Sequence, residues 1–169
     1  MSDVIVNKVA ESGIVSLDLQ DFLPGGEEIG IFDLKEYLFM GLILKEKDFR
    51  AALLGLDWAL FQGKKVAVYC SADAIVPAWA YMLVGTYLEP VASQVFLGDE
   101  EALRKELLLS AIRELPAEEY RDKRVVIKGC GDTSIPADAY LGITMKLRAV
   151  AKSIMYGEPC STVPVFKRK

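Results

Sequence analysis

Apolar and polar positions change along the chain in a pattern that predicts strands and helices in turn. Alternation over residues 14–19 predicts a half-buried strand, since one face of a strand carries every second residue, and residues 28–32 predict a second short strand. Residues 33–36, Asp-Leu-Lys-Glu, have capping-box form and predict a helix that continues through residues 37–44. A further helix is expected over residues 47–60.

The rest of the chain predicts a parallel sheet. Residues 66–70 form a continuous apolar run, which is typical of a parallel strand covered on both faces. Strand and helix then alternate, so we expect a single three-layer α/β domain over residues 1–169, with a mainly parallel sheet and a β/helical arm over residues 1–63. The further strands are expected at 94–97, 125–127, 153–156 and 163–166 (an edge strand), and the helices at 76–90, 99–115 and 136–151.

An internal repeat supports this reading. Residues 66–99 align with residues 125–158 without a gap, and Pro77-Ala78-x-Ala80-Tyr81 matches Pro136-Ala137-x-Ala139-Tyr140. In each copy, apolar helical positions recur at steps of three and four, as on a helix that packs against a sheet. We therefore expect two pseudo-repeated βαβ units, at residues 64–99 and 125–158.

Composition narrows the chemistry. The 169 residues are 52% hydrophobic, carry a net charge of −4 and include no histidine. This composition excludes Ser-His-Asp and Cys-His catalysis and His-based zinc sites, and it argues against a nucleic-acid partner. No membrane-spanning segment or signal peptide is apparent, and three cysteines do not fit a disulfide framework, so we expect a cytoplasmic protein with free thiols.

The candidate site lies where the predicted strands end, because ligands of open parallel sheets bind outside the carboxyl ends of the strands. All three cysteines fall at this predicted edge. The candidate site residues are Cys70, Ser71, Asp73, Gly129, Cys130, Asp132, Thr133, Ser134, Glu158 and Cys160.

Thiol chemistry is one use of this edge. Cys130 and Cys160, with Cys70, are candidate ligands for a soft metal or an iron–sulfur cluster, although no pair has Cys-x-x-Cys spacing. The alternative for Cys70 is a small buried residue at the end of a strand.

Anion binding is a second use. The Gly- and hydroxyl-rich loop 129–134 enters a predicted helix, whose free N–H groups favour a phosphate, but it matches no established phosphate-binding motif. Lys128, at the end of the strand, is expected to pair with the anion or with Asp132. Alternatively, Asp73 and Asp132 are helix-capping or turn residues, and Lys128 forms an ordinary surface ion pair. Asp73 and Asp132 occupy matching repeat positions, as do Asp99 and Glu158, so close approach would suit them to acid/base work.

Three segments also carry a family resemblance: residues 70–77 (Cys-Ser-Ala-Asp-Ala-Ile-Val-Pro), 127–130 (Ile-Lys-Gly-Cys) and 157–164 (Gly-Glu-Pro-Cys-Ser-Thr-Val-Pro). Over nearly its whole length the chain resembles an uncharacterised bacterial domain-of-unknown-function family, the one numbered 2480. The resemblance implies no catalytic residue. Gene surroundings associated with this family suggest either iron–sulfur assembly or sugar-phosphate isomerisation.

Three functions remain open, and neither a cofactor nor an enzymatic activity is fixed by the sequence. The first is a cytoplasmic accessory or binding protein with a thiol- or metal-related role. The second is an enzyme, such as an isomerase, that binds a small phosphorylated metabolite. The third is a structural homodimer that associates through Tyr37, Leu38 and Leu42, in the apolar segment 37–44. We expect no nucleic acid or membrane as a partner.

Overall fold

The chain folds into two compact units, each with its own β-sheet. The computed structural model describes residues 13–129, 131–158 and 160–169. Unit 1 consists of Met1–Leu23 and Lys105–Lys169, and unit 2 consists of Pro24–Arg104. Unit 2 is therefore inserted into unit 1 along the sequence.

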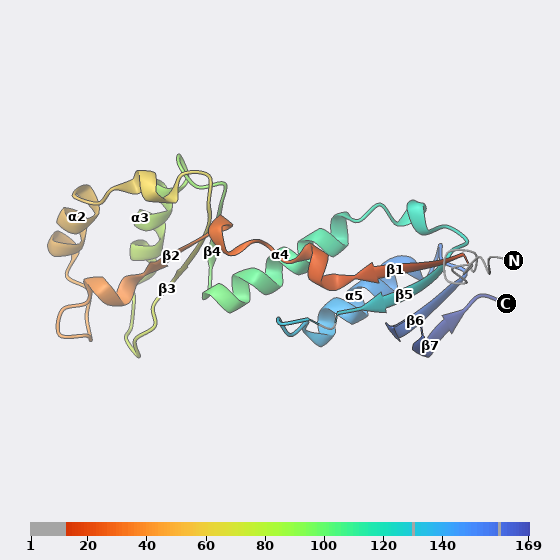
Figure 1. Cartoon of the computed structure of the whole chain (residues 1–169). Helices are drawn as coiled ribbons and strands as arrows, with labels where there is room; N and C mark the ends of the chain where they lie inside the picture. Colours follow the sequence, from red (N-terminus) through yellow and green to blue (C-terminus); the bar gives the residue numbers. More distant parts are fainter. Residues whose placement is uncertain (1–12, 130, 159) are drawn as a thin grey trace, which may run out of the picture. The chain divides into compact units, whose positions relative to one another are not determined.

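Unit 2 is a parallel three-stranded sheet with two α-helices (Figure 1). Its strands are in the order β2-β3-β4, with α2 between β2 and β3 and α3 between β3 and β4 along the chain. The elements are η2 (Gly26–Glu28), β2 (Ile29–Asp33), η3 (Leu34–Tyr37), α2 (Glu46–Leu54), η4 (Trp58–Phe61), β3 (Lys65–Tyr69), α3 (Ala78–Leu88) and β4 (Gln94–Leu97), where η denotes a 3₁₀ helix.

Unit 1 has the same plan with one additional strand. Its sheet has the order β1-β5-β6-β7, in which the first three strands are parallel and β7 is antiparallel to β6. Helix α4 begins in the last residues of unit 2 and continues into unit 1. The elements are β1 (Ile14–Asp18), η1 (Leu19–Phe22), α4 (Glu100–Glu114), η5 (Ala117–Tyr120), β5 (Arg124–Lys128), α5 (Ala137–Leu147), β6 (Ser153–Glu158) and β7 (Ser161–Lys167).

The predicted α/β class with mainly parallel strand pairing is confirmed. The expectation of one sheet within a three-layer domain is corrected, because the strands form two separate sheets. In unit 2, Val66 and Val68 point to the same side of β3 and share one core with residues of both α2 and α3. In each sheet, successive parallel strands along the chain are added on the same side of the strand before them. Because each connection between them is a right-handed crossover, both helices of a unit lie on the same face of its sheet. Each unit is thus a helical layer on one face of a sheet.

The internal repeat is confirmed at the level of element boundaries. An offset of 59 residues carries β3 onto β5, α3 onto α5, and β4 onto the first four residues of β6. Backbone hydrogen bonds repeat as well: Ser93 N donates to Lys64 O over 2.8 Å, and Lys152 N donates to Lys123 O over 2.8 Å.

The repeat extends further than the aligned sequence. The same offset carries α2 onto the second part of α4 and η4 onto η5. The first strand and 3₁₀ helix of the two units, β1–η1 and β2–η3, correspond to each other with a different offset, of 15 residues. One complete copy is therefore nested inside the other.

The whole buried core of unit 2 is repeated within the larger core of unit 1. Every buried residue of the unit 2 core has a buried counterpart in the unit 1 core. The pairs are Phe32/Leu17, Leu34/Leu19, Phe49/Leu108, Leu53/Ile112, Val66/Val125, Val68/Ile127, Ala80/Ala139, Val84/Ile143 and Leu88/Leu147.

The helix predicted for residues 37–44 is wrong. Asp33 does cap a helix, but this helix is the short η3, and its side chain accepts from Lys35 N. The chain then turns back on itself, with Phe39 N donating to Ile43 O over 2.7 Å. Met40 and Gly41 occupy the turn with φ of 54° and 70°, a left-handed pair that closes a tight hairpin. We refer to residues 38–44 as the apolar hairpin.

The predicted edge strand at the end of the chain is confirmed as β7. Pro164, which has no N–H to donate, pairs with Met155 beside a register shift in the ladder. Across the described residues, no helix combines the length and hydrophobicity needed to cross a bilayer.

Candidate functional site

The predicted site residues follow strands of two different sheets, so the single shared edge is replaced by two edges. Cys70, Ser71 and Asp73 follow β3 in unit 2. The loop that begins at Gly129 follows β5 in unit 1, and Glu158 ends β6. Cys130 lies outside the described residues.

The unit 2 edge is held together by Asp33, at the end of β2. One carboxylate oxygen accepts from the N–H groups of Lys35 and Ser71 at 2.9 and 3.0 Å, and the other accepts from the Ser71 hydroxyl at 2.5 Å. Partial burial raises the pKa of Asp33, but the hydrogen bonds from Ser71 and Lys35 outweigh it and hold this pKa below its ordinary value. Ser71 therefore ties β3 to β2, which is a structural role.

Cys70 and Asp73 have simpler surroundings. The Cys70 thiol is half-buried and lies 3.7 Å from the carbonyl oxygen of Ala72. Burial, together with the adjacent Cys70, raises the pKa of Tyr81. Asp73 is exposed and makes no hydrogen bond or ion pair with any residue that the structure describes.

The unit 1 edge carries alternating charges. Lys128 Nζ lies 3.5 Å from an oxygen of Asp18 and 3.9 Å from an oxygen of Glu158. The sequence predicts an anion, Asp132 or an ordinary surface carboxylate as the partner of Lys128, and the structure places Lys128 between the carboxylates of Asp18 and Glu158. Two carboxylates around one ammonium group make this edge unfavourable for an anion.

The glycines of the unit 1 loop are explained by close packing. A Cβ atom on Gly129 would collide with the hydroxyl of Tyr140, and one on Gly131 would lie 2.8 Å from the side chain of Gln20. Gln20 in turn donates its amide to the carbonyl oxygens of Gly129 and Thr133, at 3.1 and 2.6 Å. The loop is thus fastened to β1–η1. Sequence reasoning missed Gln20 because its partners are more than a hundred residues away.

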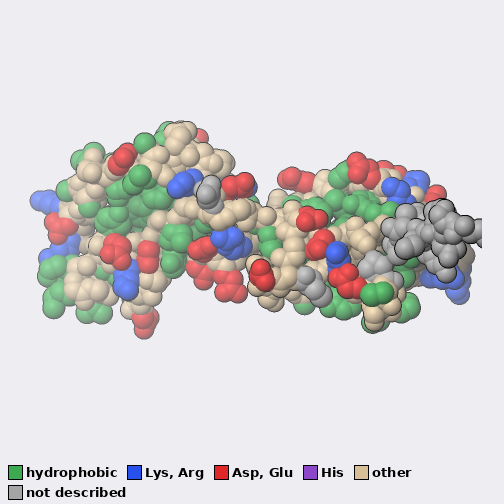
Figure 2. Space-filling model, viewed as in Figure 1, with side chains coloured by type: hydrophobic (Ala, Val, Ile, Leu, Met, Phe, Trp, Pro, Cys, Tyr) green, Lys and Arg blue, Asp and Glu red, His purple; other side chains and the backbone are tan. Residues whose placement is uncertain are grey.

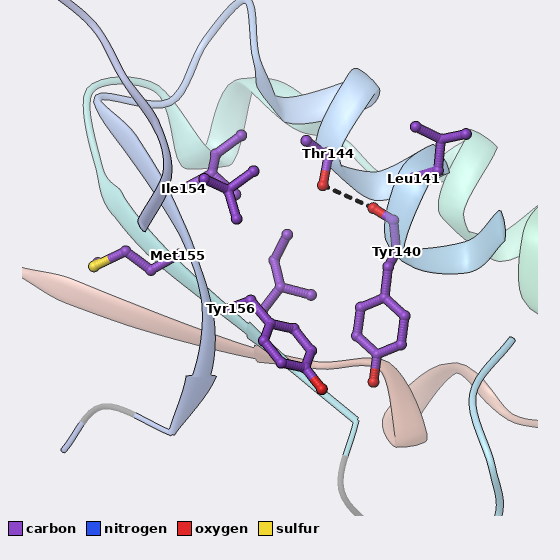
Figure 3. Close-up of a pocket in the computed structure, with 8 residues that line it drawn as sticks. Tyr140, Leu141, Thr144, Ile154, Met155 and Tyr156 are labelled. Carbon is purple, nitrogen blue, oxygen red and sulfur yellow. Dashed lines mark hydrogen bonds between the residues drawn. The ribbon is translucent and has the colours of Figure 1, made fainter. Parts of the chain in front are cut away.

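A mainly apolar cavity of about 460 Å³ lies beside this edge, between α5 and strands β6 and β7. Figure 3 shows the rings of Tyr140 and Tyr156 next to each other, with both hydroxyls pointing the same way. Their ring centroids are 5.4 Å apart in an edge-to-face arrangement, and Thr144 donates its hydroxyl to Tyr140 O over 2.7 Å. The lining residues are Ile127, Tyr140, Leu141, Thr144, Ile154, Met155, Tyr156 and Val165.

Comparison with protein families now identifies the group to which the chain belongs. The model of the family described as "Protein of unknown function (DUF2480)" matches residues 3–168. The chain belongs to the DUF2480 family. No curated protein and no solved structure matches it.

The thiols of this DUF2480 chain differ in accessibility. Cys160 is exposed, in the turn between β6 and β7, whereas Cys70 is half-buried. Within the described parts of the chain, no group of three or more Cys, Asp or Glu side chains is arranged to hold a metal ion.

The matching carboxylates of this DUF2480 chain have different roles in the two units. Asp99 caps α4, since its side chain accepts from Ala102 N over 2.8 Å. Its counterpart Glu158 is followed by a strand instead of a helix, and it faces Lys128. Asp132, Thr133 and Ser134 are exposed.

Proposed function

We propose that the protein is a small-molecule-binding accessory protein, and that its ligand occupies the cavity of unit 1. The observation that carries this proposal is the cavity itself, whose volume is in the range of small-ligand sites. Apolar side chains line most of it, and the hydroxyls of Tyr140 and Tyr156 provide polar groups that can orient a ligand.

The internal duplication separates residues that the fold requires from residues that it does not. Unit 2 builds the same elements with Gly85 in place of Thr144, Leu97 in place of Tyr156 and Tyr69 in place of Lys128. No strand of unit 2 corresponds to β7, which provides Val165. Tyr140 is repeated in unit 2 as Tyr81, but Thr144, Tyr156 and β7 have no equivalent there. Most of the polar lining is therefore specific to unit 1, which supports a role beyond folding.

The charges at this edge restrict the ligand. Tyr140 reaches Gly129, the residue that follows Lys128, so the hydroxyl end of the cavity lies at the end of β5. Asp18 and Glu158 outnumber Lys128 there and oppose a phosphate. The geometry favours an apolar ligand with a neutral polar group, bound in the cavity. It does not favour a phosphorylated metabolite bound by the loop of residues 129–134.

Binding of the neutral fluorescent dye Nile red tests this proposal. Thr144→Phe fills the cavity, and we expect it to weaken dye binding by about tenfold or more, because the space is lost. Met82→Phe is the control, since Met82 is exposed on the corresponding helix of unit 2, where it is the counterpart of the lining residue Leu141. Equal dye binding by the wild type and Thr144→Phe would refute the proposal.

A thiol-related role in a reducing cytoplasm is a second candidate, favoured by the exposure of Cys160. A thiol at the tip of a hairpin is accessible to a soft metal or to a cluster donor, as an iron–sulfur accessory role requires. Anaerobic incubation with ferrous iron and sulfide, followed by absorption spectroscopy, tests it. Cys160→Ser and Cys130→Ser should abolish uptake, while Cys70→Ser should retain it. Absence of uptake by the wild type would reject this role.

A further inference from the structure

Positive charge gathers at the opposite edge of the unit 1 sheet, where its parallel strands begin. Figure 2 shows basic side chains at the end of unit 1 where Figure 1 places the C-terminus. The exposed cations of this basic edge are Lys123, Arg124, Arg148, Lys152, Lys167, Arg168 and Lys169.

Backbone pairing fixes these residues next to one another. Lys152 N donates to Lys123 O over 2.8 Å, and Arg168 N donates to Lys152 O over 2.9 Å. Arg124 pairs with Ser153, which pairs with Lys167 on the next strand. Arg124 and Lys167 therefore lie on β5 and β7, and the other cations lie just beyond the ends of β5, α5, β6 and β7 at the same edge.

Few of these charges are neutralised. Arg168 pairs with Asp122 over 2.6 Å and also donates to the carbonyl oxygen of Val150, so it anchors the final residues. No other cation of the basic edge forms an ion pair with a residue that the structure describes. Among the described residues, the cations of this edge thus outnumber the carboxylates that pair with them. Closely spaced like charges destabilise a fold, so their clustering calls for another explanation.

The second copy of the fold shows that folding does not require this charge. Glu89 occupies in unit 2 the position of Arg148, and Ser93 occupies that of Lys152. Lys65, the counterpart of Arg124, is paired with Glu28 at 3.1 Å. The same elements thus form in unit 2 with a nearly balanced edge.

A cavity of about 460 Å³ opens among these cations. It is lined by Arg148, Ala149, Phe166, Lys167, Arg168 and Lys169. The Arg148 guanidinium lies 5.0 Å from the centre of the Phe166 ring, in a cation–π contact that orients it.

We propose that the basic edge binds a small organic anion with at least two negative charges, either a phosphate ester or a polycarboxylate. Arg148 is the principal ligand, because a guanidinium binds phosphate or carboxylate oxygens in pairs. Lys167 and Lys169 add charge, and the Phe166 ring provides an apolar surface for the organic part. This site is separate from the cavity beside Tyr140, and neither proposal depends on the other.

Isothermal titration at constant ionic strength tests the site, with inorganic pyrophosphate as the phosphate probe and citrate as the carboxylate probe. We expect Arg148→Glu, which introduces the residue found in unit 2, to weaken binding by about tenfold or more. Arg148→Gln should have a smaller effect in the same direction. Lys47→Glu changes the net charge equally at an exposed position in unit 2 and should leave binding unchanged.

The outcomes are distinguishable. Binding of pyrophosphate alone assigns a phosphate ester, binding of citrate alone assigns a polycarboxylate, and binding of both supports the general anion site. Absence of binding, or an equal loss in Lys47→Glu, would overturn the proposal. Melting temperatures confirm that each variant folds, and Nile red binding by Arg148→Glu should equal that of the wild type.

Discussion

Asp33 shows how single residues connect neighbouring strands in this fold. It accepts three hydrogen bonds, of which two come from Ser71, at the end of the adjacent strand. Its counterpart Asp18 likewise accepts from the backbone N–H of Gln20 at 3.0 Å. The sequence identified Asp33 as a helix cap from its local pattern. The bonds from Ser71 could not be predicted, because they join residues that are distant in sequence.

The lowered pKa of Asp33 predicts a pH-dependent stability. The pKa of Asp33 in the folded state lies below its unfolded value of 3.8. The stabilisation that the ionised carboxylate gives the folded state is therefore complete above pH 3.8 and is lost as the pH falls through the folded-state pKa. Between about pH 5 and pH 2, the wild type should therefore lose stability relative to Asp33→Asn. Urea denaturation at a series of pH values measures this difference.

Ser71→Ala is the companion variant for this measurement. It removes the hydroxyl donor, so the pKa of Asp33 should rise and the acid-dependent loss should shrink. Carboxyl chemical shifts followed by NMR report this pKa directly. If the free energy of unfolding of the wild type and that of Asp33→Asn change in parallel with pH, the lowered pKa of Asp33 is contradicted.

The loop glycines give a second prediction at this scale. Gly129→Ala should destabilise unit 1 by about 1–3 kcal/mol, because the added methyl group collides with Tyr140 and lies 2.9 Å from buried Ile135. Gly85→Ala is the control: it lies within α3 with no heavy atom near the added methyl, and it should stabilise by about 0.5–1 kcal/mol. Chemical denaturation measures both.

A double variant identifies the cause of the Gly129→Ala effect. If the collision with the Tyr140 hydroxyl causes the loss, Tyr140→Phe should cost less in the Gly129→Ala background than in the wild type. If the effects of the two substitutions on the free energy of unfolding are additive, the Tyr140 hydroxyl does not cause the loss in Gly129→Ala.

At the scale of elements, the hydrophobic pattern predicted most helices and strands close to their observed bounds. The pattern was sufficient where an element buries one periodic face, as α3 and α5 do. It failed at the apolar hairpin, where every position except Gly41 is hydrophobic and only this glycine marks a turn. Pairing was also beyond the sequence: Leu17 lies beside Ile127 in the sheet, a neighbour that local pattern cannot specify.

The apolar hairpin also bears on self-association. Phe39, Met40, Leu42 and Ile43 are all exposed on it. The other residues expected at a dimer contact, Tyr37 and Leu38, are half-buried. Tyr37 stacks on Phe32 with ring centroids 5.4 Å apart, so it belongs to the core of unit 2. A dimer contact would therefore depend on the hairpin tip.

Leu42→Glu tests this contact by placing a charge on the tip. Leu42 is 63% exposed, so the monomer should tolerate the substitution, whereas a buried contact should be lost. Leu54→Glu, at a position 76% exposed on α2, is the matched control. In sedimentation velocity, we expect a wild-type dimer, a monomeric Leu42→Glu and a dimeric Leu54→Glu. A monomeric wild type would exclude the contact.

At the scale of the whole molecule, the nested duplication has produced two units of unequal charge. Unit 2 carries seven Lys and Arg against twelve Asp and Glu, while unit 1 carries thirteen against twelve. Each of the nine buried residues of the unit 2 core has a buried apolar counterpart in unit 1, so the charge difference lies in the edges and the surface. The repeat was visible in the sequence, but the nesting was not, because it depends on which strands pair.

Two separate cores predict two units that unfold separately. Leu88 and Leu147 are identical, fully buried and equivalent in the duplication, and each belongs to only one core. Leu88→Ala and Leu147→Ala should each cost about 2–5 kcal/mol, because each leaves a cavity.

Native-state hydrogen exchange shows where this cost is felt. Leu88→Ala should speed exchange in β3 and α3 while β5 and α5 stay protected, and Leu147→Ala should do the reverse, because regions with separate cores open separately. Since the two variants delete the same side chain at matched positions, each serves as the control for the other. Faster exchange throughout the chain in both variants would show instead that the two units unfold as one.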